Sequence, residues 1–339
     1  MTPEKKKKIR NIIIIASVSF ISLYVIGGMT ASFIVNDWVY KSNTSEVSEL
    51  EEYPYNLFKI RKDYPLLSER KEYTFKSGNN TLYGYYYDVS DDKGLVIAAH
   101  GLSNLSDGSI ATMHNYFVEL GYDVFAIDLT GSGKSEGDST IGLHQSAYDI
   151  KAGYQYLEDN NLIKDNLILF GHSWGAYGSV VASNMGVPAS KVIACSAYDR
   201  PIDLMFDMAV SQTGVLAYLT YPPFMLGNFL EYGQKAFKRA SSLIKKSESR
   251  YLLIQGEKDE LVPYKDTLYK RALGYDNVTS LYLEDVGHDY PWLDVSSLEY
   301  IKSKEKEHDD NPSGLLSVDL ESSSQISPLV DTVIKEFLE

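Results

Sequence analysis

An apolar run that passes directly into a Gly-x-Ser-x-Gly motif constrains the fold of this chain more than any other feature. Residues 167–170 read as a buried strand, the motif holds Ser173 between Gly171 and Gly175, and small residues typical of a packed helix follow. A serine nucleophile must be displayed on a sharp turn, and a Cβ at either glycine would clash with the neighbouring strand and helix. This context favours a catalytic serine over the alternative, in which Ser173 only caps the helix.

Composition limits the classes of protein that the chain can represent. With 339 residues, 44% of them hydrophobic, it can bury a large α/β domain with accessories, or two small domains. A net charge of -14 argues against nucleic acid as the main partner, because phosphate binding needs a basic face. The single cysteine, Cys195, falls in an expected core strand, so the sequence offers no intrachain disulfide and no thiolate-rich metal site.

The N-terminal region predicts a membrane anchor. No charged residue lies between Ile12 and Val35, and a helix of that length crosses a hydrocarbon layer of about 30 Å. Four lysines and Arg10 precede the run, which predicts a basic cytoplasmic tail over residues 1–11. Trp38 and Tyr40 suit the far interface. The sequence therefore predicts a single-pass signal anchor over 12–35, with everything after it outside the cytoplasm.

Two alternatives compete with the anchor. A cleaved signal peptide is disfavoured because the apolar run exceeds a normal h-region and no small-x-small cleavage site follows. A buried helix of a soluble domain is disfavoured by the lysines that flank the run.

The rest of the chain predicts a mostly parallel α/β sheet with helices on both faces. A stalk is expected over 36–52, of which residues 41–52 are polar and acidic, and the catalytic domain is expected over 53–339. Two strands around a Gly78-Asn79-Asn80 turn predict an antiparallel entry hairpin. Strands and helices then alternate. The expected strands are 72–75, 81–88, 95–99, 124–127, 167–170, 192–195, 251–254 and 280–283, and the expected helices are 110–120, 145–157 and 329–338.

Two segments interrupt this alternation. Residues 199–250 contain no strand-like run and are rich in methionine and aromatic residues, which predicts a helical cap over the carboxyl edge of the sheet. These side chains can line an acyl pocket or form the core of the cap itself, and both readings stay open. Residues 302–327 are charged and serine-rich, and we expect a surface loop or a disordered excursion there, before the last helix.

A catalytic serine needs a base and an acid that orients the base. An expected strand leads into a loop that holds Asp259, and the last expected strand leads into a loop that holds His288. Carboxyl-end loops of parallel strands converge on one edge of a sheet, so these side chains are expected near Ser173. The order serine, acid, histidine is the one typical of this kind of turn.

Five motifs in this order resemble the α/β-hydrolase superfamily, and within it the group of monoacylglycerol-lipase-like and serine-aminopeptidase-like enzymes. The resemblance covers residues 72–338, but neither the anchor nor the segment 302–327. The motifs are His100-Gly101, Asp128-x-x-Gly131-x-Gly133-x-Ser135, Gly171-x-Ser173-x-Gly175, Gly256-x-x-Asp259-x-x-Val262-Pro263 and Gly287-His288.

The resemblance implies a role for five residues. Ser173 is implied as the nucleophile, His288 as the base and Asp259 as the orienting acid. The backbone N–H groups of Leu102 and Trp174 are implied as the oxyanion hole that binds substrate. A single donor of this kind contributes roughly 3 kcal/mol.

Other polar residues have more ordinary interpretations. Glu257 and Glu260 flank Asp259 on what is expected to be a solvated loop. His100 and His172 are expected at the site as packing or hydrogen-bonding groups, and His114, His144 and His308 are not expected to act. No His-Glu-x-x-His motif supports a zinc hydrolase, and neither phosphate-loop nor dinucleotide spacing fits the glycines after Asp128, so we expect no metal and no cofactor.

Three functions remain open from the sequence. The first is a membrane-anchored carboxylic-ester hydrolase that acts on a monoacylglycerol, lysophospholipid or similar lipid-like ester through an acyl-enzyme. The second is an exopeptidase that holds the substrate amine with Asp199, Asp203 or Asp207. The third is a catalytically idle fold used for surface binding. The sequence carries no signal for a particular oligomeric state.

Overall fold

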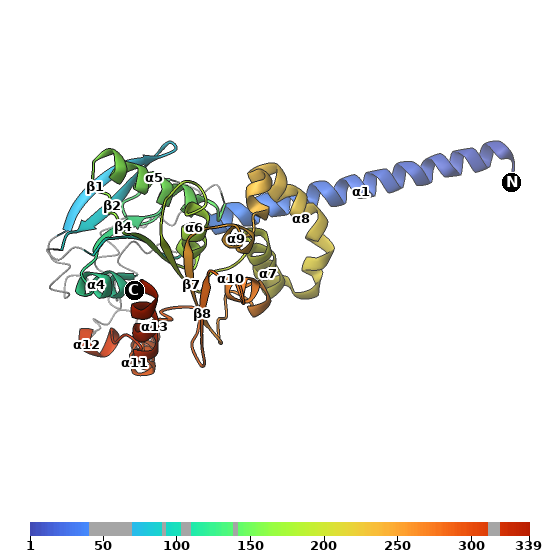
Figure 1. Cartoon of the computed structure of the whole chain (residues 1–339). Helices are drawn as coiled ribbons and strands as arrows, with labels where there is room; N and C mark the ends of the chain where they lie inside the picture. The colour runs from blue at the N-terminus through green and yellow to red at the C-terminus, as the bar shows by residue number, and fades with distance from the viewer. Residues whose placement is uncertain (41–69, 90–92, 103–109, 138–141, 311–318) are drawn as a thin grey trace.

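The computed structural model describes residues 1–40, 70–89, 93–102, 110–137, 142–310 and 319–339, in which one sheet is covered by helices on both faces (Figure 1). The eight strands are ordered β1-β2-β4-β3-β5-β6-β7-β8. Their bounds are Arg70–Ser77 (β1), Asn80–Tyr87 (β2), Leu95–Ala99 (β3), Asp123–Asp128 (β4), Leu167–His172 (β5), Lys191–Cys195 (β6), Arg250–Gly256 (β7) and Val278–Leu283 (β8).

The sheet begins antiparallel and continues parallel. Strand β1 pairs with β2 around a turn in which Gly78 has a φ of 60°, and β2 pairs antiparallel with β4. Every other neighbouring pair is parallel. The mostly parallel sheet with an antiparallel entry hairpin is therefore confirmed.

Alternating side chains of the central strands fill two cores. On β3, Leu95 and Ile97 face one core, whereas Val96 and Ala98 face the other. Such continuous apolar runs belong to strands buried on both faces. Helices α5 (Gln145–Asp159) and α6 (Trp174–Ala182) cover the first core, and α4 (Ala111–Glu119) and α13 (Pro328–Leu338) cover the second.

A helical cap lies between β6 and β7, as predicted. It consists of α7 (Pro201–Thr213), η4 (Gly214–Leu216), α8 (Ala217–Tyr232), η5 (Gly233–Phe237) and α9 (Ala240–Ile244). The large apolar side chains of the cap differ in their exposure to solvent. Met205, Phe206 and Phe224 are buried, whereas Tyr218 and Phe229 are exposed.

Helix α1 (Pro3–Tyr40) projects from the body of the molecule, and the C-terminal half of α1 contacts α8 (Figure 1). Among the described residues it is the one helix long and apolar enough to cross a membrane, a test that a signal sequence also passes. Helix α1 continues to Tyr40, into the first residues of the stalk expected over 36–52. Residues 41–52, the expected domain start at Tyr53, and the side chains of Trp38 and Tyr40 lie outside the described residues.

The expectation of a surface loop or a disordered excursion over 302–327 is wrong for its first part, residues 302–310. Helix α11 (Val295–Asp310) runs through it, and a short α12 (Leu320–Ser323) follows; residues 311–318 are not described. Ile301 anchors α11 in the core, while beyond it Lys304 pairs with Glu307 at 2.9 Å. A solvated charged helix has no apolar period to reveal it, so its sequence resembles a loop. The remaining helical segments are η6 (Tyr264–Asp266) and α10 (Leu268–Ala272).

Candidate active site

Ser173 stands on a strained turn between β5 and α6, with φ 50° and ψ -109°. A Cβ at Gly171 would meet the backbone of Gly175, and one at Gly175 would meet the carbonyl oxygens of Ala99 and His100. The two glycines therefore allow the strand and helix to approach closely enough to hold Ser173 in this conformation. A positive φ at a serine is uncommon and marks a position that the surrounding structure enforces.

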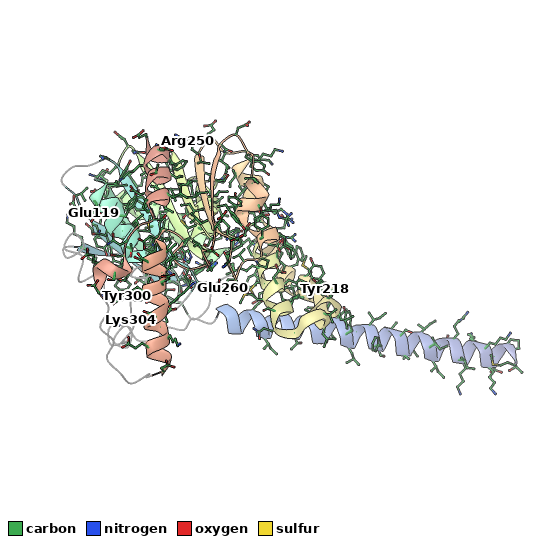
Figure 2. All side chains as sticks on the ribbon, turned by 90° about the horizontal axis from the view of Figure 1, so that it is seen from below. Glu119, Tyr218, Arg250, Glu260, Tyr300 and Lys304 are labelled. Carbon is green, nitrogen blue, oxygen red and sulfur yellow. The ribbon has the colours of Figure 1, made fainter. Side chains whose placement is uncertain are left out.

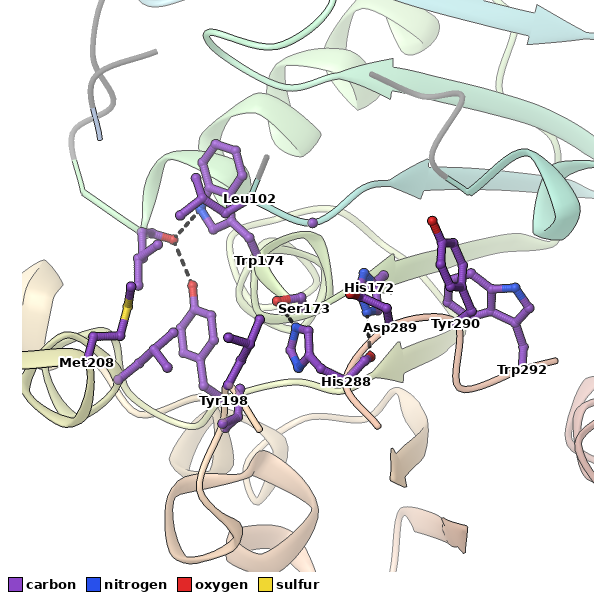
Figure 3. Close-up of a pocket in the computed structure, with 15 residues that line it drawn as sticks. Leu102, His172, Ser173, Trp174, Tyr198, Met208, His288, Asp289, Tyr290 and Trp292 are labelled. Carbon is purple, nitrogen blue, oxygen red and sulfur yellow. Dashed lines mark hydrogen bonds between the residues drawn. The ribbon is translucent and has the colours of Figure 1, made fainter. Parts of the chain in front are cut away.

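Ser173, His288 and Asp259 form one hydrogen-bonded chain, the first part of which Figure 3 shows. The distance from His288 Nε2 to Ser173 Oγ is 2.9 Å, and Nδ1 lies 2.9 Å from each carboxylate oxygen of Asp259. The side chains of His288 and Asp259 are each 3% exposed. The loops that follow β7 and β8 supply them, at the same edge of the sheet as Ser173.

The charges in this chain stabilise one another. Burial by itself raises the pKa of Asp259, but the hydrogen bond and charge of His288 and further donors lower it below its ordinary value. Burial likewise lowers the pKa of His288, but its hydrogen bond to Asp259 and that carboxylate's charge outweigh burial and raise it. Asp259 is thus an ionised acceptor that orients the imidazole.

Three donors besides His288 hold the Asp259 carboxylate. Gln255 Nε2 donates to it at 2.8 Å, and the backbone N–H groups of Leu261 and Val262 donate at 3.0 and 2.8 Å. Of the two flanking glutamates, Glu260 accepts from the backbone N–H of His288 at 3.4 Å, and Glu257 accepts from that of Asp285. Gln255 was not singled out by the sequence, although it lies on β7 four residues before Asp259.

The backbone of His288 is fixed by two side chains. Ser196 Oγ donates to the His288 carbonyl oxygen at 2.8 Å, and His172 Nε2 lies 3.0 Å from the same oxygen. Burial, followed by the nearby His288, lowers the pKa of His172 to about 4, so His172 is neutral near pH 7. Its role as a hydrogen-bonding group agrees with the expectation. Ser196 was not foreseen, although it directly follows β6 at the same edge of the sheet.

The other histidines take no part in the hydrogen-bonded chain of Ser173, His288 and Asp259 and make structural contacts elsewhere. His100 accepts from the backbone N–H of Leu129 at 3.1 Å through Nε2, and its Nδ1 lies 2.7 Å from the carbonyl oxygen of Gly101. The expectation of a hydrogen-bonding His100 is therefore confirmed. His144 is buried against the hydroxyl of Tyr177, and His114 is buried beside Tyr87. The side chain of His308 lies outside the described residues.

A cavity of about 300 Å³ opens beside Ser173. Leu102 and Trp174, whose N–H groups the resemblance implies as oxyanion donors, both line it, as do Leu204 and Met208 of α7. The lining as a whole is mainly apolar. Its other residues are Gly101, Leu143, His172, Tyr198, Leu261, Val262, His288, Asp289, Tyr290 and Trp292. Figure 3 shows Tyr198 and Trp174 directed toward the backbone oxygen of Leu143, to which both donate. Such a lining suits an apolar ligand with one polar group held at the serine.

One set of groups within the described residues has donor atoms close enough for a metal ion. These are His172, His288 and Asp289, whose donor atoms lie within 4.8 Å of one another. Both ring nitrogens of His288 are already engaged by Ser173 and Asp259. Coordination through His288 would break that hydrogen-bonded chain, so the set fits a metal poorly.

Part of the chain is similar in sequence to known proteins. The model of a family described as serine aminopeptidase, S33, matches residues 90–212, which include Ser173. The multifunctional-autoprocessing repeats-in-toxin protein of Vibrio vulnificus is 26% identical over 148 residues, 40% of this chain but 3% of the toxin. The corresponding Vibrio cholerae protein is 25% identical over the same length. This chain thus spans a small fraction of the length of these relatives.

Solved structures share the fold. An esterase of Pyrococcus furiosus superposes with a TM-score of 0.54 at 22% identity, covering 74% of this chain and 93% of its own. A putative lipase of Acinetobacter baumannii superposes with a TM-score of 0.50 at 16% identity, covering 75% and 97%. At these identities the likeness concerns the architecture of the chain.

Proposed function

Because the chain belongs by fold to the α/β-hydrolase superfamily, we propose that it is a membrane-anchored serine hydrolase that cleaves carboxylic esters through an acyl-enzyme. The observation that carries the proposal is the hydrogen-bonded chain from Asp259 through His288 to Ser173, at the wall of a mainly apolar cavity. The substrate class that we propose is a monoacylglycerol, a lysophospholipid or a similar lipid-like ester.

The proposed reaction has two halves. Ser173 Oγ attacks the ester carbonyl carbon while its proton passes to His288 Nε2, and the backbone N–H groups of Leu102 and Trp174 stabilise the oxyanion. The intermediate expels the alcohol, which takes the proton from His288, and leaves an acyl group on Ser173. Water then attacks the acyl carbon as His288 accepts its proton, and the proton returns to Ser173 as the carboxylic acid leaves. Asp259 stays ionised throughout and holds the imidazole in the required tautomer.

The anchor is part of the same proposal. Lysines 5–8 and Arg10 precede an uncharged run from Ile12 to Val35, which supports a cytoplasmic N-terminus and a catalytic domain on the opposite side of the membrane. A tethered enzyme meets amphipathic esters at a high local concentration, which is consistent with the proposed substrate class.

Replacement of the nucleophile tests the reaction. Ser173→Ala is expected to lower kcat for an acyl ester by about a million-fold. Its thermal unfolding should stay almost unchanged, because the substitution removes one hydroxyl from a turn that glycines define. Turnover and fluorophosphonate labelling of both proteins measure this. Retained turnover in Ser173→Ala would remove Ser173 from the mechanism, and an unlabelled wild-type protein would favour a catalytically idle binding fold.

A second candidate is an exopeptidase, and the position of one carboxylate favours it. Asp199, Asp203 and Asp207 do not line the cavity; they pair with Arg239, Arg200 and Lys265. Asp289, however, lines the cavity and is exposed, so its carboxylate is available to hold a substrate amine. Turnover of an aminoacyl-anilide that exceeds that of an acyl ester, with a KM raised by Asp289→Asn for the anilide alone, would select this function.

A further inference from the structure

Helix α8 runs alongside the second half of α1 in the same direction (Figure 1). The hydroxyl of Tyr24 donates to the backbone oxygen of Leu219, and Asn36 Nδ2 donates to Glu231 Oε2 at 2.7 Å. Both pairs are separated by 195 residues. This constant offset means that the two helices lie parallel over residues 24–36 and 219–231.

The contact between these helices is made of small and hydrogen-bonded residues. A Cβ at Gly28 would overlap the ring of Pro223, and a Cβ at Gly227 would lie 2.8 Å from Ser32. Beside the second of these contacts, Asn228 Nδ2 donates to Ser32 Oγ at 3.0 Å. Close backbone approach at small residues, joined by polar side chains, is how helices associate inside a bilayer.

The outer surface of the cap helices is apolar and open. We call α7, η4 and α8 together, residues 201–232, the cap hairpin. Its sequence has no charged residue between Asp207 and Glu231. Several large apolar side chains of this run are exposed, and Figure 2 shows Tyr218 on the part of the hairpin beside α1, away from the sheet. They are Val215 (77%), Leu216 (63%), Tyr218 (60%), Leu219 (66%), Leu226 (41%), Phe229 (49%) and Leu230 (58%).

The serine and threonine hydroxyl groups near the end of the hairpin already have partners in the backbone. Ser211 donates to Met208 O, and Thr213 donates to Ala209 O. Thr220 donates to Ala217 O in the same way. Hydroxyls bonded back to helix carbonyls enter hydrocarbon at a low cost, because no donor is left without an acceptor.

The pairing fixes a depth. A helix rises about 18 Å from Tyr24 to Asn36, and half of the hydrocarbon layer is about 15 Å thick. Leu219 lies level with Tyr24, so an anchor that ends near Asn36 would carry the end of the hairpin about as far as the bilayer centre. Of the two charges that bound the apolar run, Glu231 lies at the sheet end of α8, level with Asn36, where it can stay at the interface. Asp207 lies midway along α7 and pairs with Lys265 at 3.0 Å.

We propose that the cap hairpin is inserted among the acyl chains of the leaflet on the catalytic side, paired with α1. This proposal rests on the membrane anchor of the proposed function and adds to it. Leu204 and Met208 of α7 line the cavity beside Ser173, so the apolar wall of the cavity is continuous with the inserted hairpin. A lipid ester then reaches Ser173 along α7 from within its leaflet.

Depth-dependent quenching tests the insertion in the full chain. Single cysteines at Leu219→Cys (hairpin), Ile15→Cys (α1) and Leu273→Cys (after α10) are labelled with an environment-sensitive fluorophore; all three side chains are exposed. The native Cys195 is fully buried, and burial raises the pKa of its thiol, so it does not compete for the label. In phosphatidylcholine vesicles with nitroxide-labelled acyl chains, we expect quenching at positions 219 and 15 and none at 273.

The outcomes separate the hairpin from the anchor. Quenching at 15 without quenching at 219 would overturn the inserted hairpin and leave the anchor standing, whereas quenching at neither would refute the anchor itself. Shielding of position 219 from aqueous iodide without acyl-chain quenching would indicate a protein neighbour, such as a second copy, and would also overturn the proposal.

A matched pair of glycine variants tests the pairing. Gly28→Ile forces α1 away from Pro223, whereas the neighbouring Gly27 has nothing within 4 Å of a Cβ. We expect Gly28→Ile to reduce acyl-chain quenching at position 219 and Gly27→Ile to preserve it, with soluble-ester turnover retained in both. Equal quenching in the two variants would overturn the paired arrangement.

Discussion

The catalytic edge of the sheet and the cap hairpin are held in place by opposite means. At the catalytic edge, the positions of Ser173, Asp259 and His288 are each fixed by several contacts, and His288 and Asp259 are almost fully buried. The hairpin instead leaves side chains such as Val215 and Leu219 more than half exposed. Chemistry needs groups held to within fractions of an ångström, whereas a lipid layer accommodates any apolar surface. The difference is consistent with the two proposals, a reaction at the edge and contact with a lipid layer at the hairpin.

The largest expected effect breaks the catalytic edge at its acid. Asp259→Asn should lower kcat for an acyl ester by about ten-thousand-fold, because an amide no longer holds the imidazole in the tautomer that accepts the serine proton. Steady-state kinetics measures it. Glu257→Gln is the control, since that carboxylate flanks Asp259 in the same loop but accepts from the backbone N–H of Asp285. Equal losses in the two variants would contradict the assignment of Asp259.

The sequence predicted the edge at which Ser173, Asp259 and His288 meet, because chain order and strand ends determine that edge. Ser173, Asp259 and His288 each follow a run that reads as a strand, and parallel strands bring their carboxyl ends to one edge. Gln255 and Ser196 escaped notice because they act by orienting other groups, which leaves no spacing to recognise. The pairing of Gly28 with Pro223 depends on a contact across nearly two hundred residues, and periodicity within a helix carries no information about such a partner.

A second comparison sets a sheet leucine against a hairpin leucine. Leu253 on β7 is 1% exposed, so Leu253→Ala should lower the free energy of unfolding by about 2–5 kcal/mol. Leu219 is 66% exposed, and Leu219→Ala should change that free energy by less than about 0.5 kcal/mol. Urea unfolding of the detergent-solubilised chain measures both. A comparable loss in the two variants would mean that position 219 is packed against protein.

The smallest expected effect is on the pH profile. The reaction needs neutral His288, whose pKa lies above 6.5, so kcat/KM should rise with pH, about tenfold per unit, until it levels off above that value. His172 and His144 do not titrate in this range, because burial lowers the pKa of each to about 4. Kinetics between pH 5 and about 9 records the profile.

Removal of a carboxylate near His288 provides a second test of this profile. The carboxylates facing His288 are Asp259, Asp289 and Glu260, and each raises its pKa. Asp289→Asn removes one of them, and we therefore expect the midpoint to move to lower pH. A profile that is flat or falls between pH 6 and about 8 would show that His288 is not the base.

The paired positions of α1 and α8 are 195 residues apart in the sequence, so α1 is synthesised well before α8 can pair with it. At about 5–20 residues per second, a ribosome needs roughly 10–40 s to make the intervening chain. During that interval the face of α1 that carries Gly28 and Ser32 has no α8 to pack against, so another helix with a small-residue face could pack there. When α8 has been made, it therefore competes with other helices for this face of α1. It has the advantage of belonging to the same polypeptide.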